Sequence, residues 1–543
     1  SVSVDVPETI NGSVVTSIGY GAFAENSNLE EVTIPSKVSD LQYGAFQSCK
    51  NLKSVKFEQD SELQTIGSST FYSCEKLTDI VIPDGVEEIG KAGFADSGLI
   101  SIDIPDSVVN IEDNLFYNCD SLSEVTLGKG MKQIGRNMFY GCSALKEIDI
   151  PENITTIGIY AFCGSGLTTI SIPDSVLKME GGVFSGCRSL SQVKLGNGIQ
   201  GIEGGMFYGC SQLQEIVIPD GITYIGQTAF YSSGLTSVDI PDSVTSIGEN
   251  AFANCVNLKK ADIGNGTAYI AISAFSGCDL TDLIIGNQVE EIGIRAFQSN
   301  ANLKSVTIPN SVTKIEYSAF QGCTSLLEIE IPDSVEAIGQ DAFDGTAWYD
   351  AQEDGIVYTG RVLYKYKGEI SEDNSVITVQ DGTKGIAGGA FYQQKELKEI
   401  VIPEGVTNIG MYAFLGCESL KAITVPTSVT EIGAYALGYL SKSGRPIEGF
   451  TIYGASGSAA QSYAEENGFQ FVAVEPPYVS GDVNEDGEIN ISDLRLVLRK
   501  VCGKAELTSS QEFAADVEKD GAVNIKDLRK ILRYVCGKID SFE

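Results

Sequence analysis

The sequence predicts a β-rich solenoid of about 18 stacked coils with short parallel strands, followed by a small all-α module. Three observations support this fold class. Phe recurs every 22 or 23 residues along most of the chain, each repeat holds one strand-like segment, and the pattern changes in the last 63 residues. The length of 543 residues alone would indicate three or four domains, so the repeat and not the length decides the prediction.

Phe anchors the repeat, and seventeen of the chain's 23 Phe lie on it. They stand at positions 23, 46, 71, 94, 116, 139, 162, 184, 207, 230, 252, 275, 297, 320, 343, 391 and 414, and Leu437 takes the next place. The unit reads I-G-x-x-A-F-x-x-C-x-x-L-x-x-I-x-I-P-x-x-V. Its L-x-x-I-x-I segment alternates apolar and polar residues, which predicts a strand with one buried face. Pro ends the strand, and Ile-Gly marks the turn into the next coil.

A unit this short cannot bury its own apolar side, so its copies should stack and form one long parallel sheet. The pattern resembles the leucine-rich repeats of BspA-like bacterial surface proteins, with Ile-x-Ile-Pro and Ala-Phe-x-x-Cys in the family's usual places. The resemblance covers residues 1–440. It implies a leucine-rich-repeat solenoid on a secreted or cell-surface protein that serves adhesion or protein interaction. Residues 1–7 already read as part of a coil, so we expect a further segment upstream.

Ten of the thirteen Cys lie three residues after a repeat Phe. They are at positions 49, 74, 119, 142, 187, 210, 255, 278, 323 and 417. One Cys per coil does not easily assemble a four-ligand metal site, and no C-x-x-C occurs. We interpret them as a column of buried thiols acting as small apolar side chains. So many unpaired thiols in an exported protein indicate an anaerobic habitat.

The repeat is interrupted at residues 344–385, where two strand-like stretches surround Thr359-Gly360 and predict a β-hairpin. Five aromatic residues gather there, and we expect them to cover the core where regular stacking breaks, with a binding patch as the alternative. They are Trp348, Tyr349, Tyr358, Tyr364 and Tyr366. Residues 441–474 should form a cap, with a helix over 459–467 that Gly468 ends, followed by a strand over 469–472. A short linker follows at 475–480.

Two loops near the C-terminus have the period of an EF-hand loop. Calcium takes six to eight hard oxygen ligands, and Gly at the sixth position provides the sharp turn. The first loop offers Asp482, Asn484, Asp486, the backbone carbonyl of Glu488, Asn490 and Asp493. The second offers Asp516, Glu518, Asp520, the carbonyl of Ala522, Asn524 and Asp527. Because the whole pattern recurs after 34 residues, we expect two Ca²⁺ ions.

Each loop leads into a predicted helix, Leu494–Cys502 and Leu528–Cys536, each followed by Gly-Lys. This duplicated unit, without the incoming helix of an EF-hand, closely resembles a type I dockerin over residues 481–543. The resemblance implies calcium-dependent binding to a cohesin module of a scaffoldin, and hence a secreted, cellulosome or cell-surface protein of an anaerobic bacterium. Asp at the twelfth loop position is usual in dockerins, whereas Glu518 is longer than the usual residue.

Helical spacing predicts a buried stripe on each helix. Its residues are Leu494, Leu498 and Val501 in the first helix, and Leu528, Leu532 and Val535 in the second. In dockerins, residues late in each loop and along the following helix contact the cohesin. The resemblance therefore nominates Ile491, Ser492, Arg495 and Arg499, or Ile525, Lys526, Arg529 and Arg533. This near-symmetry predicts two alternative binding orientations.

The net charge of −36 argues against nucleic acid and anionic membrane surfaces as partners. No apolar run is long enough to insert into a membrane. The charge is concentrated on the first 480 residues, which carry −33. The outward strand positions are mostly acidic or small, which suits a basic protein partner better than a neutral polysaccharide, although acidic residues also keep a sheet soluble. The acidic ones are Asp79, Asp103, Glu124, Glu147, Asp149, Glu215, Asp239, Asp282, Glu328, Glu330 and Glu399.

The chain has no His, which removes Ser–His and Cys–His nucleophile pairs and His-based zinc sites. Carboxylate-pair chemistry stays open, but the acidic face offers many pairs and no evident cleft. We therefore expect no catalytic residue and a recognition solenoid with a calcium-dependent anchor. The alternatives are a cellulosomal carbohydrate-active enzyme or carbohydrate-binding protein, with its site in the solenoid or upstream, and a rigid spacer without a ligand.

Overall fold

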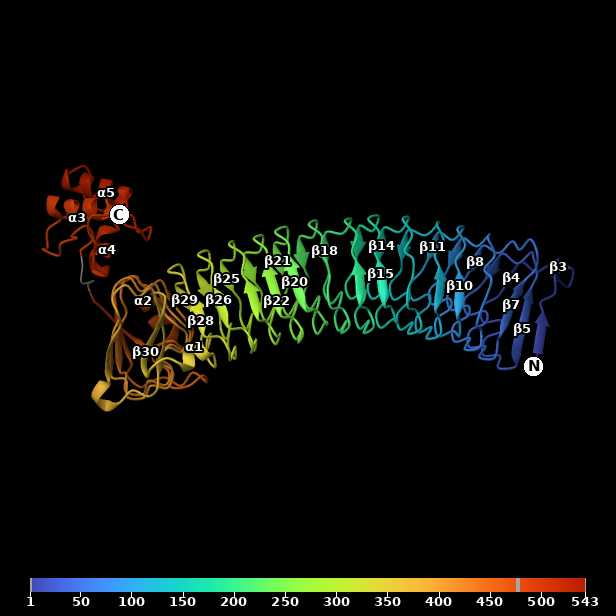
Figure 1. Ribbon diagram of the computed structural model, residues 1–543, viewed down its shortest axis with the longest axis horizontal. Coiled ribbons are helices and arrows are strands. Elements are labelled where there is room, and N and C mark those ends of the chain that lie inside the picture. The colour runs from blue at the N-terminus through green and yellow to red at the C-terminus, as the bar shows by residue number, and fades with distance from the viewer. Residues whose placement is uncertain (1, 475–478, 543) are drawn as a thin grey trace. The chain divides into compact units, whose positions relative to one another are not determined.

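The computed structural model describes residues 2–474 and 479–542 (Figure 1). The expected linker at 475–480 therefore lies largely outside the described residues. The chain forms two compact units. The N-terminal unit comprises Ser1–Val289, Ala296–Val306 and Gly322–Leu326, and the C-terminal unit comprises Glu290–Arg295, Thr307–Gln321 and Leu327–Glu543.

The N-terminal unit is a β-solenoid, as predicted, in which the I-x-I segments form strands of three to six residues. These are β1 (Val2–Asp5), β5 (Leu29–Ile34), β7 (Ser54–Phe57), β10 (Ser101–Asp103), β12 (Glu124–Thr126), β15 (Thr169–Ser171), β17 (Gln192–Lys194), β20 (Ser237–Ile240), β22 (Lys260–Ile263) and β24 (Asp282–Ile284). β26 (Ser305–Thr307) has residues in both units. Neighbouring strands run parallel one coil apart, so that Ile240 lies opposite Ile263. They form separate sheets of two or three strands, where the sequence suggested one long sheet.

A second row of parallel strands, which the sequence did not predict, runs through the Ile-Gly segments of the N-terminal unit and is divided among three separate sheets. Its strands have only two residues, too few to show a periodic pattern. They are β4 (Ser17–Ile18), β6 (Asp40–Leu41), β8 (Thr65–Ile66), β9 (Glu88–Ile89), β11 (Asn110–Ile111), β13 (Gln133–Ile134), β14 (Thr156–Ile157), β16 (Lys178–Met179), β18 (Gly201–Ile202), β19 (Tyr224–Ile225), β21 (Ser246–Ile247) and β23 (Tyr269–Ile270). An antiparallel hairpin, β2 (Thr9–Ile10) and β3 (Ser13–Val14), precedes them.

The repeat Phe residues form a continuous ladder in the core of the N-terminal unit. Successive rings are stacked, with centroids between 4.9 and 5.9 Å apart. Most of these side chains are fully buried. Stacking one large apolar ring on the next explains why a single Phe in each coil is enough to build the core.

The ten repeat Cys are buried, as expected, but they also form hydrogen bonds. Each thiol lies within hydrogen-bond distance of the backbone carbonyl of the Phe one coil earlier, as Cys142 does with Phe116 at 3.2 Å. Where Cys is absent the chain places another polar residue, such as Asn300, whose amide donates to Phe275 at 2.9 Å. The column is therefore a ladder of donors between coils as well as an apolar filling.

The C-terminal unit continues the same architecture around the insertion. Its first strands are β25 (Glu291–Ile292), β27 (Lys314–Ile315), β28 (Glu328–Glu330) and β29 (Ala337–Ile338). The insertion begins with the short helix α1 (Ala347–Asp350) and continues as the expected hairpin of β30 (Gly355–Thr359) and β31 (Val362–Lys367), followed by the 3-10 helix η1 (Glu372–Asn374). Regular coils then resume with β32 (Val376–Thr378), β33 (Gly385–Ile386), β34 (Glu399–Val401), β35 (Asn408–Ile409), β36 (Ala422–Thr424) and β37 (Glu431–Ile432).

The aromatic residues of the insertion pack on the core, as the structural interpretation predicted. Tyr364 is buried and lies edge-on to Phe343 at 5.5 Å, and Trp348 meets the same ring at 5.5 Å. Tyr366 lies 6.3 Å from Phe391, where the stacked ladder resumes. The insertion therefore bridges the gap in the Phe spacing with aromatic side chains of its own.

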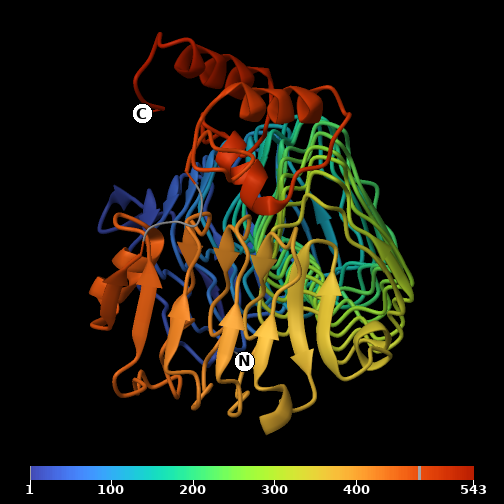
Figure 2. The same ribbon diagram turned by 90° about the vertical axis from the view of Figure 1, so that its left-hand side faces the viewer.

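The cap has the expected order of helix and strand. Its elements are β38 (Thr451–Gly454), α2 (Ala459–Asn467) and β39 (Gln470–Ala473). Gly468 ends the helix with φ 72°, and β39 pairs in parallel with β38 (Figure 2). Across both units the chain makes about 21 turns. The number exceeds 18 because the N-terminal turn, the insertion and the cap lack a repeat Phe.

The described C-terminal residues beyond the cap form three helices, α3 (Ile491–Val501), α4 (Ser509–Ala515) and α5 (Ile525–Val535). Two were predicted, three residues too late in each case, and α4 was missed. Its capping box, Thr508 with Gln511, is a sequence signal that indicates a helix start. Within the described residues, no helix is both long and apolar enough to cross a bilayer.

Candidate metal centre

The two C-terminal loops share one scheme of hydrogen bonds. Asp482 accepts the backbone N–H groups four and five residues further along, at 3.1 and 2.7 Å. Asp516 accepts the corresponding groups at 3.1 and 2.8 Å. Gly487 and Gly521 adopt φ values of 86° and 81°, a left-handed conformation that Gly takes without a steric penalty. Each loop is therefore folded tightly around its first carboxylate.

The last Asp of each loop ties the loop to the helix that follows. Asp493 is fully buried and accepts N–H groups from both ends of the first loop, from Val483 at 2.8 Å and from Asn490 at 2.8 Å. Asp527 is equally buried and accepts the N–H groups of Glu518 and Asn524 in the second loop at 3.0 and 2.9 Å. Both residues complete capping boxes, which explains why α3 and α5 begin earlier than predicted.

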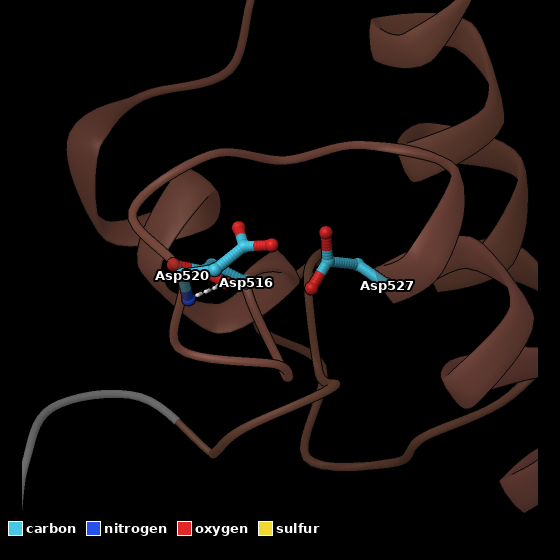
Figure 3. Close-up of side chains that lie close together, drawn as sticks. All are labelled: Asp516, Asp520 and Asp527. Atoms are coloured by element: carbon cyan, nitrogen blue, oxygen red, sulfur yellow. Dashed lines mark hydrogen bonds between the residues drawn. The ribbon is translucent and has the colours of Figure 1, made fainter.

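Three carboxylates of the second loop converge on one point (Figure 3). Asp516, Asp520 and Asp527 each offer an oxygen, and these oxygens all lie within 4.8 Å of one another. Ca²⁺ binds oxygen at about 2.3–2.6 Å, so oxygens that share one ion lie up to about 5 Å apart. The cluster therefore fits a calcium ion without rearrangement of its backbone.

The carboxylate of Asp486 in the first loop is engaged within the loop. One oxygen accepts the N–H of Glu488 at 2.9 Å, and the other accepts the amide of Asn484 at 2.7 Å. In the second loop, the Asn524 amide donates to the Ala522 carbonyl at 2.8 Å. Several of the expected ligands thus bond to one another, and rotations of these side chains would turn their oxygens toward an ion.

Three of the loop carboxylates are buried. Asp482 is 4% exposed, and Asp493 and Asp527 are fully buried. Among the described residues no Lys or Arg forms an ion pair with any of the three. Backbone N–H groups stabilise these charges, but an unpaired buried carboxylate remains unfavourable. Burial also raises the pKa of the Asp516 carboxyl. A divalent cation in each loop would supply the missing positive charge.

The second loop carries cations of its own, which the first lacks. Lys526 lies 3.0 Å from Asp520, and its hydrogen bond lowers the pKa of that carboxyl. Lys530 lies 3.7 Å from Glu518, the residue that departs from the usual dockerin ligand. Ser492 and Leu496 occupy the two Lys positions in the first repeat. The two loops therefore differ in charge although their backbones match.

The helices bury part of the expected stripe, with two of its six residues exposed and two neighbouring residues buried in their place. Leu498 and Leu532 were predicted to be core, but they are 47% and 44% exposed. Val497 and Ile531 are fully buried in their place. Helical spacing is compatible with either stripe, and the capped start of each helix fixes which side faces the core. Leu494, Val501, Leu528 and Val535 pack against the core while partly exposed.

The exposed side of each helix carries the nominated partner-binding residues. Ile491 and Ile525 are 56% and 49% exposed. The remaining six, Ser492, Arg495, Arg499, Lys526, Arg529 and Arg533, are exposed as well. Sequence reasoning missed Leu498 and Leu532, although their positions seven residues after each Ile place them on the same helix face. Each helix thus presents exposed apolar side chains together with two Arg.

The chain belongs to the family of BspA type leucine-rich repeat proteins. The model of this family matches residues 4–123, 109–236, 223–348 and 371–445. The repeat region is joined to a C-terminal dockerin type I domain, whose model matches residues 480–536. No protein with curated annotation is similar enough to the chain to count as a match.

Solved structures of bacterial leucine-rich repeat proteins are similar to the chain. One from Bacteroides ovatus has 27% sequence identity and a TM-score of 0.52, and the match covers 76% of this chain and 92% of that protein. A leucine-rich cell surface protein from Faecalibacterium prausnitzii has 29% identity and a TM-score of 0.40, with 60% and 87% covered. A third, from Eubacterium ventriosum, has 25% identity and a TM-score of 0.36, with 55% and 84% covered. The first of these supports the solenoid fold.

Proposed function

We propose that the protein is a secreted, non-catalytic component of a cellulosome-type assembly. Its dockerin binds two Ca²⁺ ions and, once loaded, binds a cohesin module of a scaffoldin. Its solenoid serves protein recognition or adhesion within that assembly. Both recognised regions match families that are typical of binding proteins, and the family comparisons identify no catalytic domain.

The observation that carries the calcium part is the set of buried carboxylates, Asp482, Asp493 and Asp527, that form no ion pair with a Lys or Arg of the described residues. Each loop holds its first and last Asp in position through backbone N–H groups, which leaves further oxygen lone pairs available. A bound ion would compensate the charge and fix the start of α3 and of α5. Ca²⁺ binding should therefore order the two helix faces that meet the cohesin.

The cohesin part rests on the duplicated, exposed helix faces. Ile491, Arg495 and Leu498 follow one another at spacings of four and three residues, so they share one side of α3. The same pattern recurs on α5. Arg is enriched among the residues that dominate protein interfaces, and exposed apolar side chains beside it provide surface to bury on binding. Because the two helix faces are so alike, either α3 or α5 could make the main contact with the cohesin, as the dual-orientation hypothesis requires.

Affinity for a type I cohesin, measured by calorimetry on the full chain with Ca²⁺, tests this proposal. The pair Arg495→Ala/Arg499→Ala on α3 and the pair Arg529→Ala/Arg533→Ala on α5 should each leave binding largely intact, whereas the quadruple variant should lose it. Arg136→Ala/Arg188→Ala, in the solenoid, is the matched control. Loss of binding in one pair alone would contradict the dual orientation, and full binding by the quadruple variant would contradict the proposed surface.

A further inference from the structure

The N-terminal unit has a hollow of about 590 Å³ over β20, β22 and the coils beside them. Five carboxylate residues line it, and no Lys or Arg does. They are Glu215, Asp220, Asp239, Asp242 and Asp262. No aromatic side chain lines the hollow, so it offers no stacking platform for a sugar ring. The charge of this hollow suits a cationic ligand.

Four side chains, one from each of four successive coils, line the hollow in a row whose order is apolar, acidic, acidic, apolar. Val217, Asp239, Asp262 and Ile284 occupy the same place in four successive coils, and the last three are direct neighbours across the parallel strands. Val217 and Ile284 are 81% and 52% exposed, so both aliphatic side chains are open to contact with a ligand. Two apolar contacts therefore border a central acidic pair.

The two central carboxylates differ in their partners. Asp239 forms an ion pair with Lys260 at 3.4 Å. Asp262 is half-buried, and among the described residues it accepts no hydrogen bond and pairs with no cation. A half-buried carboxylate without a partner gains more from a bound cation than an exposed one does, because water screens it less. Asp262 is thus the group to which a ligand cation would bind.

The spacing fits an extended peptide that crosses the strands. Parallel strands lie about 4.8 Å apart, so the side chains of Val217 and Ile284 are separated by three spacings, or about 14 Å. An extended peptide rises about 3.4 Å per residue, so residues i and i+4 lie about 13.6 Å apart and point to the same side as i+2. The middle residue then falls between Asp239 and Asp262.

We propose that this hollow binds an extended segment of a basic protein with the pattern apolar–x–basic–x–apolar. The two apolar side chains contact Val217 and Ile284, and the central Arg or Lys binds Asp262 and, in competition with Lys260, Asp239. This inference rests on the protein-recognition role proposed for the solenoid and names the chemistry of its partner.

A fluorescent peptide Gly-Leu-Ser-Arg-Ser-Leu-Gly, titrated with the full chain and followed by anisotropy, tests the inference. It should bind. Asp262→Asn should weaken binding about tenfold, as expected for loss of a charge-assisted contact. Val217→Ser and Ile284→Ser should each weaken it several-fold. Asp149→Asn, which removes an exposed carboxylate at the corresponding place in an earlier coil, is the matched control and should bind as the wild type does.

Two further measurements test whether the hollow binds the peptide through its positive charge. A peptide with Glu in place of Arg should not bind, and raising NaCl from about 0.05 to 0.5 M should weaken the Arg peptide. Equal binding of both peptides or unchanged binding by Asp262→Asn would each overturn the proposal. Cohesin affinity measured on the same variants should be unchanged, so failure here is distinguishable from failure of the anchor.

Discussion

Replacing Cys142 tests whether the buried thiols hold the coils together as hydrogen-bond donors. Its sulfur is fully buried and lies 3.2 Å from the Phe116 carbonyl, which also accepts the N–H of Cys119 at 3.1 Å. Burial raises the pKa of this thiol well above its usual value, so it keeps its proton at neutral pH and can donate it. Cys142→Ala removes both the donor and the sulfur volume, whereas Cys142→Ser keeps a donor.

The magnitudes follow from these contacts. Loss of one weak hydrogen bond costs about 0.5–1 kcal/mol, since the carbonyl keeps its second donor. Loss of a buried group the size of a methylene costs about 1 kcal/mol more. Cys142→Ala should therefore lower the free energy of unfolding by about 1.5–2 kcal/mol. Cys142→Ser should cost no more than this, because its hydroxyl still donates to Phe116.

Urea unfolding with reductant, followed by far-UV circular dichroism, gives the overall change. Since coils of a solenoid contact only their neighbours, amide exchange of residues 116–145 should report the local loss most directly. If Cys142→Ser proves clearly more destabilising than Cys142→Ala, the thiol serves only as an apolar filler and the donor ladder is refuted.

Three further predictions concern the thiols and the second loop. With Ellman's reagent, the exposed Cys502 and Cys536 of the native protein should react fast and Cys163 slowly. The ten buried repeat Cys should react only after unfolding, and fast reaction of these ten thiols in the native protein would contradict the fold. Burial raises the pKa of Cys119 to about 11 and that of Cys187 to about 12, so both stay neutral in the folded state while unfolded thiols ionise above about pH 8.5. The contribution of these buried thiols to the free energy of unfolding should therefore be fully present below about pH 8.5 and decrease as the pH rises further, which a falling urea midpoint would show. A midpoint that stays constant up to about pH 10.5 would contradict this prediction. Lys526→Ser should raise calcium affinity at the second loop several-fold in terbium luminescence titrations, because Lys526 no longer competes for Asp520; Lys504→Ser is the control, and unchanged affinity would contradict the competition.

The solenoid could be predicted because its information is local and repeated. Each Phe, Cys and I-x-I segment has the same role in every coil, so the alignment of copies reveals the core. The two-residue strands, such as β21, escaped prediction since two residues carry no period. The donor role of Cys142 could not be foreseen either, because its acceptor, Phe116, lies one coil away and only stacking brings them together.

In the dockerin, the sequence pattern located both acidic loops but not the orientation of the helices behind them. Leu498 and Val497 are adjacent, and either could face the core by periodicity alone. The capping box of Asn490 with Asp493 fixes the start of α3 and so decides the buried side. The ion pair of Lys530 with Glu518 was also out of reach, since it depends on how α5 packs beside its own loop.

The central claim is that calcium in the two loops controls attachment to a cohesin. Calorimetric titration of the full chain with a type I cohesin, in Ca²⁺ and again after chelation by EDTA, tests it most directly. We predict tight one-to-one binding in Ca²⁺, loss of binding in EDTA, and recovery when Ca²⁺ is restored. Equal affinity with and without the chelator would contradict the account.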